Sequence, residues 1–88
     1  MNGIGWAVKE MLDGKKVRRA GWNGKGMFIY HVPANSYPAQ TGAAKSHFGE
    51  NALVPYKAYV AMKTADNDVV PWLCSQTDLL ATDWEGVE

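Results

Sequence analysis

Apolar residues recur at helical spacing in only one long segment of this chain, and that restriction constrains the fold more than any other feature. In the segment 3–13 they occupy positions i, i+4, i+7 and i+8, which predicts an amphipathic helix of about three turns. These residues are Ile4, Val8, Met11 and Leu12. We expect Asn2 to cap the start of this helix and Gly14 to follow its end in a left-handed conformation. Most of the remaining chain must then form short strands.

Several later segments have the alternation, or the β-branched and aromatic residues, that are typical of strands. They are 16–20, 27–32, 57–64 and 69–72, and 83–87 adds a last short strand. We expect 16–20 to lie at a sheet edge, because its charges discourage wrong pairing, and 27–32 to be central. Asp66-Asn67-Asp68 predicts a turn that joins two of these strands into a hairpin.

Two segments between and after the strands complete the predicted fold. Ala34 to Pro55 has little periodicity and predicts a long irregular connection, a kind of segment that is usually functional or mobile. Whether it closes over a ligand is left open. Ser75-Gln76-Thr77-Asp78 has the form of a capping box and starts a short helix. Together these elements predict an α+β fold: a small antiparallel sheet of four or five strands with an N-terminal amphipathic helix and a short C-terminal helix.

Length and charge limit the classes of function. The 88 residues suit one domain, 1–88, near the lower size limit for a single core, so oligomerisation is expected. Nine basic residues balance nine acidic ones, which argues against a protein that coats DNA or RNA polymers. Basic residues gather in 15–25 and acidic residues in 66–88; they either pair across strands or subunits, or form a basic rim for phosphate. Cys74 has no partner for an internal disulfide and no apolar run is of membrane-spanning length, so we expect an intracellular protein.

Two loops, 21–26 and 70–78, combine a tryptophan with small polar residues. An indole face can stack on a nucleobase, which stabilises binding by about 1–3 kcal/mol per base, and amide or carboxyl groups can bind base and ribose edges. The candidate ligand-binding residues are Trp22, Asn23, Trp72, Ser75, Gln76 and Asp78. Each also has a structural alternative: the two tryptophans as core or interface residues, Ser75 as a helix cap, and Asp78 as a first-turn charge.

Signatures of catalysis, metal binding and cofactor binding are missing. His31 and His47 do not have the spacing of zinc ligands, and no second cysteine completes a set. Cys74 with His31 lacks any motif that would orient a nucleophile and base, and neither a Walker loop nor a GxGxxG pattern occurs. We therefore expect no catalytic residues, no metal and no cofactor.

Four stretches in a fixed order carry a family resemblance. They are GKKV after the first helix, then RRAGWNGKGMFI, MKTADNDVVPW and SQTDLLATDWE. Together they are similar to the small phage proteins of the Thoeris anti-defence 2 family, over the whole chain outside the 34–55 segment.

That resemblance implies a non-catalytic sponge, which binds cyclic ADP-ribose isomers made by Thoeris immune sensors and withholds them from their effectors. It further implies a phage- or prophage-encoded homotetramer in the host cytoplasm, with ligand pockets at protomer boundaries. Some family members also hold cyclic oligonucleotides at a separate site. By motif, Trp22 and Trp72 would be the stacking rings. Two other functions stay open: a hydrolase of such nucleotides that uses Asp78 or His31, and a phage structural or adaptor domain whose tryptophans contact a protein partner.

Overall fold

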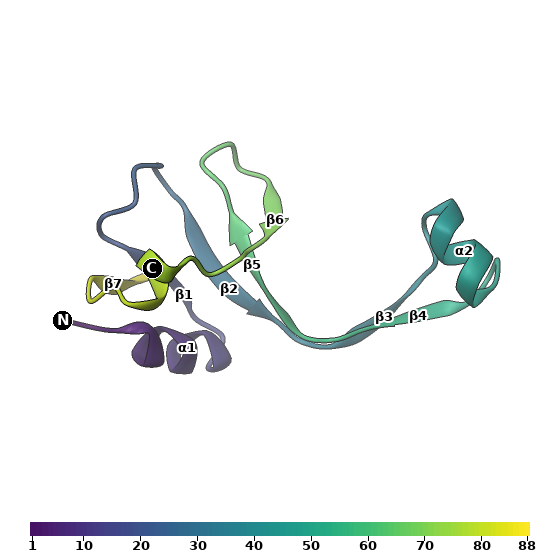
Figure 1. The fold of residues 1–88 in the computed structure, drawn as a ribbon, viewed down its shortest axis with the longest axis horizontal. Helices are drawn as coiled ribbons and strands as arrows, with labels where there is room; N and C mark the ends of the chain where they lie inside the picture. Colours follow the sequence, from purple (N-terminus) through teal and green to yellow (C-terminus); the bar gives the residue numbers. More distant parts are fainter.

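The computed structural model describes all residues, 1–88, and confirms the predicted α+β fold. One antiparallel sheet has the strand order β6-β5-β2-β1-β7, and helix α1 (Ile4–Leu12) packs on one of its faces (Figure 1). The strands are β1 Lys16–Arg19, β2 Phe28–Val32, β5 Tyr59–Lys63, β6 Val69–Pro71 and β7 Trp84–Val87. A short helix, α3 (Gln76–Leu79), lies between β6 and β7. Both chain ends lie at this end of the molecule.

The core forms between α1 and the inner face of the sheet. Its five buried members are Ala7, Met11, Val17, Ile29 and Trp84. The alternation of β2 places Ile29 on this face, opposite Val17 of β1, and both side chains are fully buried. Alternation places Phe28 and Tyr30 of β2 on the other face, where both are partly buried and their ring centroids are 5.9 Å apart.

The prediction that Asn2 caps the start of α1 is wrong, whereas the prediction for Gly14 after its end is confirmed. Gly3 is the N-cap and makes no side-chain hydrogen bond. Asn2 instead forms a parallel bridge with Asp83, and its Nδ2 donates to the carbonyl of Trp84 (3.2 Å). The chain start is therefore held by the last strand, which leaves this side chain no access to the helix. Gly14 has φ +86°, the left-handed conformation expected after the helix.

Strand β1 is internal, so the prediction of an edge strand is wrong. It pairs with β2 on one side and along its whole length with β7 on the other, from Lys16 opposite Val87 to Arg19 opposite Trp84. The basic side chains do not repel a partner because the partner is acidic: Arg18 Nε donates to Glu85 at 2.9 Å. This confirms the expectation that the basic and acidic parts of the chain pair across strands.

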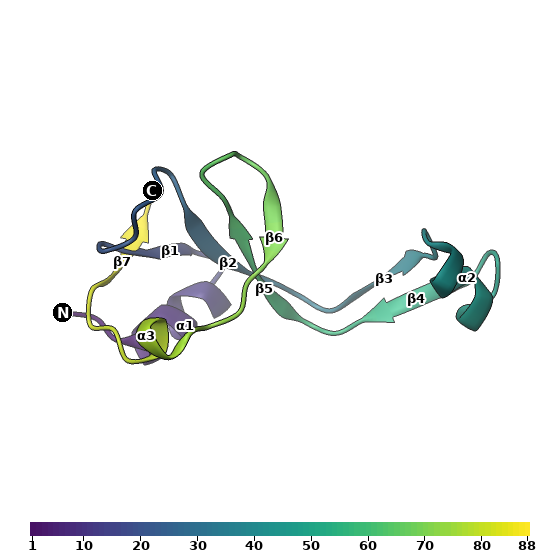
Figure 2. The same ribbon diagram turned by 45° about the horizontal axis from the view of Figure 1, so that its top comes forward.

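The segment 34–55 is ordered, so the prediction of an irregular connection is also wrong. It contains β3 (Asn35–Pro38), α2 (Gly42–Phe48) and β4 (Leu53–Tyr56), and β3 pairs with β4 as a second, two-stranded sheet. This ribbon continues the β2–β5 hairpin away from the core, giving the molecule extents of 48 × 25 × 25 Å (Figures 1 and 2). We call residues 33–56 the arm. The hydroxyl of Thr41 caps α2 by accepting from the N–H of Ala44 (3.1 Å).

The β5–β6 turn and the start of α3 follow the sequence predictions. Asn67 has φ +65° in the turn, which aspartate and asparagine tolerate better than other side chains. Ser75 caps α3 by accepting from the N–H of Asp78 at 3.1 Å. The second half of the capping box is absent, because the Asp78 carboxylate bonds elsewhere. None of the helices is long and apolar enough to cross a membrane.

Candidate functional site

Three tryptophans from separate segments meet between α3 and the sheet, and we call them the tryptophan cluster. Trp22 comes from the β1–β2 loop, Trp72 follows β6 and Trp84 opens β7. The ring centroids of Trp22 and Trp84 are 5.4 Å apart, and those of Trp72 and Trp84 are 6.1 Å apart, both edge to face. Such pairs each stabilise by about 0.5–1.5 kcal/mol beyond burial. Trp84 is 1% exposed, whereas the other two are only partly buried.

A charged layer holds this cluster in place. Arg19 Nη1 lies 2.8 Å from Asp78 Oδ1, and Arg19 Nε lies 2.7 Å from Asp83 Oδ1. The same Asp78 oxygen accepts from Trp22 Nε1 at 3.1 Å, so one carboxylate fixes both the arginine and the ring. Trp84 Nε1 donates to the main-chain carbonyl of Asp78, also at 3.1 Å. Asp78 is therefore the residue that joins the polar layer to the rings.

These contacts change the pKa values of the charged groups. Burial raises the pKa of the Asp78 carboxyl, but hydrogen bonds from Arg19 and Trp22 outweigh that effect and leave the pKa below its ordinary value. The hydrogen bond from Arg19 likewise lowers the pKa of Asp83, against the opposing effect of burial. The two carboxylates, Asp83 first, raise the pKa of Arg19. All three groups are charged over the physiological pH range.

We expect the protein to lose stability in acid because of these two carboxylates. A carboxyl whose pKa is lowered by folding stabilises the protein fully above its unfolded pKa of about 3.9, and this contribution is lost as the pH falls through the folded value. The raised pKa of Arg19 affects the stability of the protein only at strongly alkaline pH. The melting temperature should therefore hold between pH 7 and about 4.5 and fall below about pH 4. In Asp83→Asn the melting temperature should fall less steeply with decreasing pH than in the wild type. Asp13→Asn, which alters an exposed carboxylate paired with Lys9, should keep the wild-type profile; equal profiles for all three proteins would contradict this account.

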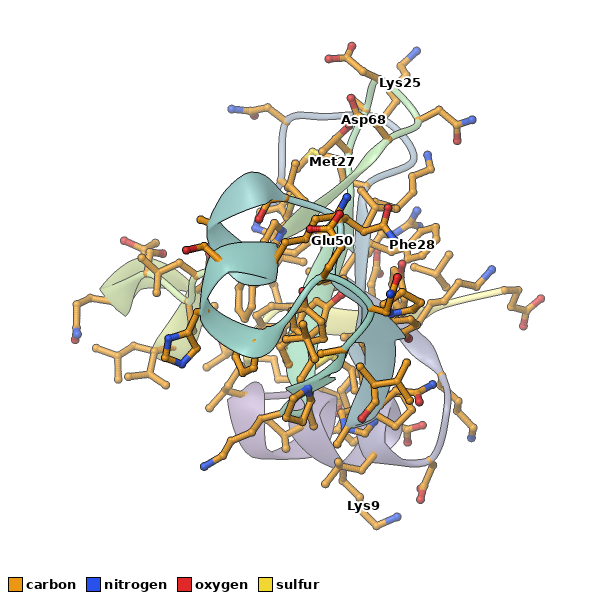
Figure 3. All side chains as sticks on the ribbon, turned by 90° about the vertical axis from the view of Figure 1, so that its right-hand side faces the viewer. Lys9, Lys25, Met27, Phe28, Glu50 and Asp68 are labelled. Atoms are coloured by element: carbon orange, nitrogen blue, oxygen red, sulfur yellow. The ribbon has the colours of Figure 1, made fainter.

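A glycine allows the β1–β2 loop to approach this layer. The N–H of Gly21 donates to Asp83 Oδ2 at 2.8 Å, and a Cβ at position 21 would lie 2.9 Å from the same oxygen. The loop base is thus tied to the charged layer, while its tip projects beyond the sheet beside the β5–β6 turn, where Lys25 and Asp68 lie (Figure 3). Lys25 takes part in none of the ion pairs of the chain.

The structure brings together three of the six residues proposed from the sequence: Trp22, Trp72 and Asp78. Ser75 is exposed and acts as a cap, and the side chains of Asn23 and Gln76 are exposed without a hydrogen bond in the chain. Three residues that form this region were not among the six candidates: Arg19, Asp83 and Trp84. Only Arg19 had a usable signal, since strand alternation places it on the face of Val17 and opposite to Arg18.

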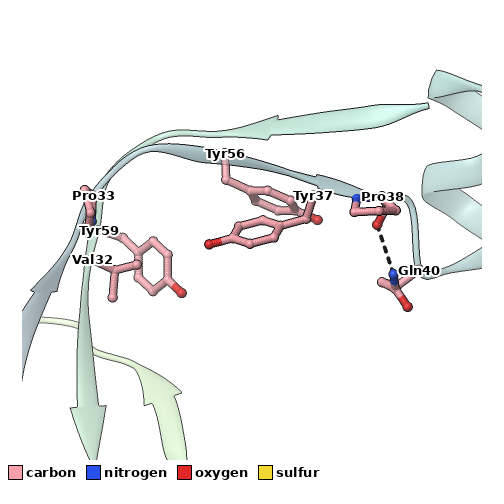
Figure 4. A pocket seen from close by; sticks show the side chains of 7 residues that line it. All are labelled: Val32, Pro33, Tyr37, Pro38, Gln40, Tyr56 and Tyr59. Atoms are coloured by element: carbon pink, nitrogen blue, oxygen red, sulfur yellow. Dashed lines mark hydrogen bonds between the residues drawn. The ribbon is translucent and has the colours of Figure 1, made fainter. Parts of the chain in front are cut away.

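The two proposed stacking rings contact each other in this chain. The centroids of Trp22 and Trp72 are 6.5 Å apart and the rings are inclined by 60°, so no parallel slot for a base separates them. The three hollows of the surface lie elsewhere. One of them, of about 360 Å³, runs along the arm from the bend at Pro33 to Gln40 beside α2, and three tyrosines line it (Figure 4).

Comparison with known proteins gives two matches over nearly the whole chain. Residues 2–87 match the family described as "Thoeris anti-defense 2-like domain". The chain is also 38% identical over 83 residues to the protein "Thoeris anti-defense 2" of Bacillus phage SP01, an alignment that covers 93% of this chain and 90% of that protein. The family resemblance proposed from the sequence is confirmed.

Proposed function

The chain belongs to the Thoeris anti-defense 2 family, and from that premise we propose that it is a non-catalytic sponge for cyclic ADP-ribose-type immune signals. Family membership itself supports a role in inhibiting Thoeris defence. The finer proposal is that the protein binds the nucleotide signal, keeps it intact and so withholds it from the Thoeris effector. It acts in the host cytoplasm, where such a signal is made.

The observation that carries the proposal is that two loops bring Trp22 and Trp72 together on Trp84, with Asp78 bonded to Trp22. Trp22 and Trp72 are both only partly buried. A ring that stacks on adenine supplies about 1–3 kcal/mol. Asn23, Ser75 and Gln76 are exposed nearby on the same two loops and would bind the edges of the base and the ribose.

The affinity that a sponge requires is within reach of such a site. A cyclic ADP-ribose has roughly 35 heavy atoms, and at about 0.3 kcal/mol per atom the binding free energy is about 10 kcal/mol. This corresponds to a dissociation constant on the order of tens of nanomolar. Because no hollow of the single chain lies at the tryptophan cluster, we propose that the site is completed at a protomer boundary of a homotetramer. The ligand phosphates would then meet Lys25 or the neighbouring subunit, since Arg18 and Arg19 are paired with carboxylates.

The state of Cys74 supports binding without catalysis. Burial raises the pKa of its thiol, and the negative charge of Asp78 raises it further, so the thiol stays protonated at neutral pH. Its sulfur donates to the carbonyl of Ser75 at 3.5 Å. Asp78 is held as a carboxylate by Arg19 and Trp22, which makes it a poor general acid. These features disfavour the alternative of a hydrolase built on this site.

A release experiment tests the proposal. The protein is mixed in excess with the cyclic ADP-ribose isomer, the free nucleotide is measured by chromatography after filtration, and the protein is then denatured by heat. We expect depletion before heating and recovery of intact nucleotide afterwards. Recovery of cleaved products would indicate a hydrolase, and absence of depletion would favour the adaptor function. The same assay with cyclic dinucleotides tests whether this chain shares the separate oligonucleotide site of some family members.

A further inference from the structure

The dipeptide Asn-Gly occurs twice in this chain, and the structure holds the two copies differently. One is Asn2-Gly3, before α1, and the other is Asn23-Gly24, in the β1–β2 loop. Asparagine is a thermolabile residue. A glycine after it has no side chain to hinder attack of the following backbone nitrogen on the asparagine amide. The sequence does not distinguish the two positions, so any difference in reactivity comes from the fold.

The first copy is held through both its side chain and its main chain. Asn2 Nδ2 donates to the carbonyl of Trp84 at 3.2 Å, and the carbonyl of Asn2 accepts from the N–H of Trp84 at 3.1 Å. Gly3 is the N-cap of α1, and its carbonyl accepts from the N–H of Ala7 at 3.2 Å. Turning the backbone so that the Gly3 nitrogen meets the Asn2 side chain would break these contacts.

The second copy has no such restraint. Asn23 is exposed and its side chain makes no hydrogen bond in the chain, and the N–H of Gly24 donates to no backbone carbonyl. Both residues lie between β1 and β2, outside the helices and strands. The loop tip projects beyond the sheet, where Lys25 and Met27 lie (Figure 3). No hydrogen bond therefore keeps the Asn23 side chain away from the Gly24 nitrogen.

The packing of the loop favours glycine at position 24. A Cβ there would lie 2.1 Å from Met27 Sδ and 3.4 Å from the Cβ of Ala65 in the β5–β6 turn. A larger residue would have to displace the Met27 side chain. The reactive dipeptide is thus a consequence of how this loop packs.

We propose that Asn23 is a site of spontaneous deamidation in the folded protein, and that the product has a lower affinity for the nucleotide. Hydroxide takes the proton of the Gly24 N–H, and the nitrogen attacks Cγ of Asn23. The new N–Cγ bond forms, the Cγ–Nδ2 bond breaks, and the amide nitrogen takes a proton from water and leaves as ammonia, which regenerates hydroxide. Water then opens the cyclic imide at one of its two carbonyls and gives aspartate or isoaspartate.

Both products place a carboxylate beside Trp22. A carboxylate has no N–H to donate to a base or ribose edge, and its charge repels the phosphates of the ligand. Isoaspartate also inserts a methylene into the backbone between Trp22 and Gly24, which changes the loop that carries the ring. This effect on affinity rests on the proposed function, whereas the modification itself does not.

The test follows both dipeptides in the same sample. The folded full-length protein is incubated for several days at mildly alkaline pH and physiological temperature, digested with trypsin and analysed by mass spectrometry. Cleavage after Lys9, Arg19 and Lys25 puts the two dipeptides in separate peptides, 1–9 and 20–25. Because conversion of Asn2 requires its hydrogen bonds to break, we expect Asn23 to convert at least about tenfold faster. In urea, where these bonds are lost, the two rates should become similar.

Two variants test the effect on binding. Asn23→Asp carries the charge of the product, and Asn23→Gln keeps an amide whose attack by the next nitrogen needs a larger, more slowly closing ring. In calorimetric titration with the cyclic ADP-ribose isomer, Asn23→Asp should bind at least about fivefold more weakly than fresh wild type, the effect of one like charge at contact distance in water. Incubation should weaken wild type in the same direction and leave Asn23→Gln as it was before incubation. Circular dichroism confirms that the samples stay folded.

The two halves of the inference fail separately. Equal conversion of Asn2 and Asn23 in the folded protein, or an Asn23 that stays intact, would overturn the modification. Nucleotide binding that neither incubation nor Asn23→Asp weakens would overturn the effect on affinity and leave the sponge standing. Selective conversion of Asn23 in a protein that binds no nucleotide would leave the modification standing and remove the sponge.

Discussion

Replacing Trp84 by alanine is expected to lower the free energy of unfolding by about 4 kcal/mol, the range for a large buried ring. Trp84 is 1% exposed and is the largest fully buried side chain. Its loss removes two edge-to-face contacts, with Trp22 and Trp72, and the indole N–H that donates to the carbonyl of Asp78, which keeps only the backbone N–H of Ala81 at 3.3 Å. At about 0.05–0.15 kcal/mol per residue, a chain of 88 residues is stable by about 4–13 kcal/mol, so this substitution removes about a third or more of its stability.

Urea unfolding followed by fluorescence measures this effect, with the midpoint compared at constant slope. Trp84→Phe serves as the matched variant, since it keeps an aromatic ring and loses the indole N–H. Its urea midpoint should lie between the midpoints of wild type and Trp84→Ala. A midpoint in Trp84→Ala within error of the wild type would contradict the assignment of this ring as the centre of the core.

The elements of the core domain could be predicted because their signals are local. The apolar period of α1 and the alternation of β2 follow from residues that face one buried side, as Met11 and Ile29 do. The arm gave no such signal, because the strands of its ribbon are exposed on almost every residue and contain a proline each. The position of β1 was missed for another reason. Sheet order depends on which distant segment supplies a partner, and the pairing of Arg18 with Glu85 spans 67 positions.

The candidate site was predicted in part for similar reasons. Glycine and polar neighbours mark the loops of Trp22 and Trp72 in the sequence, but nothing local shows that both rings pack on Trp84. Asp78 was proposed as a ligand contact or a first-turn charge. In the structure it is a first-turn residue of α3 whose carboxylate reaches Arg19 and Trp22. The two loops are thus held by the packing of their rings on Trp84 and by the hydrogen bond of Trp22 to Asp78.

Trp22→Ala is expected to weaken binding of the cyclic ADP-ribose isomer by about thirtyfold. The estimate takes about 2 kcal/mol for the loss of one stacking ring, at about 1.4 kcal/mol per tenfold change. Trp72→Ala should act in the same direction. Calorimetric titration of the folded variants measures the dissociation constant directly, and near-UV circular dichroism shows whether the remaining rings keep their packing.

Because Trp22 also packs against Trp84 and donates to Asp78, a loss of affinity must be separated from a loss of structure. Trp6→Ala provides that control: Trp6 is partly buried against the same core, but it lies on α1, outside both loops. It should lower the melting temperature while the dissociation constant stays within about twofold, a change of about 0.4 kcal/mol. Trp22→Phe, which keeps a ring without the N–H, should recover part of the affinity. Equal weakening by Trp6→Ala and Trp22→Ala would show that the substitutions act through the fold, and the tryptophan cluster would then be a structural feature alone.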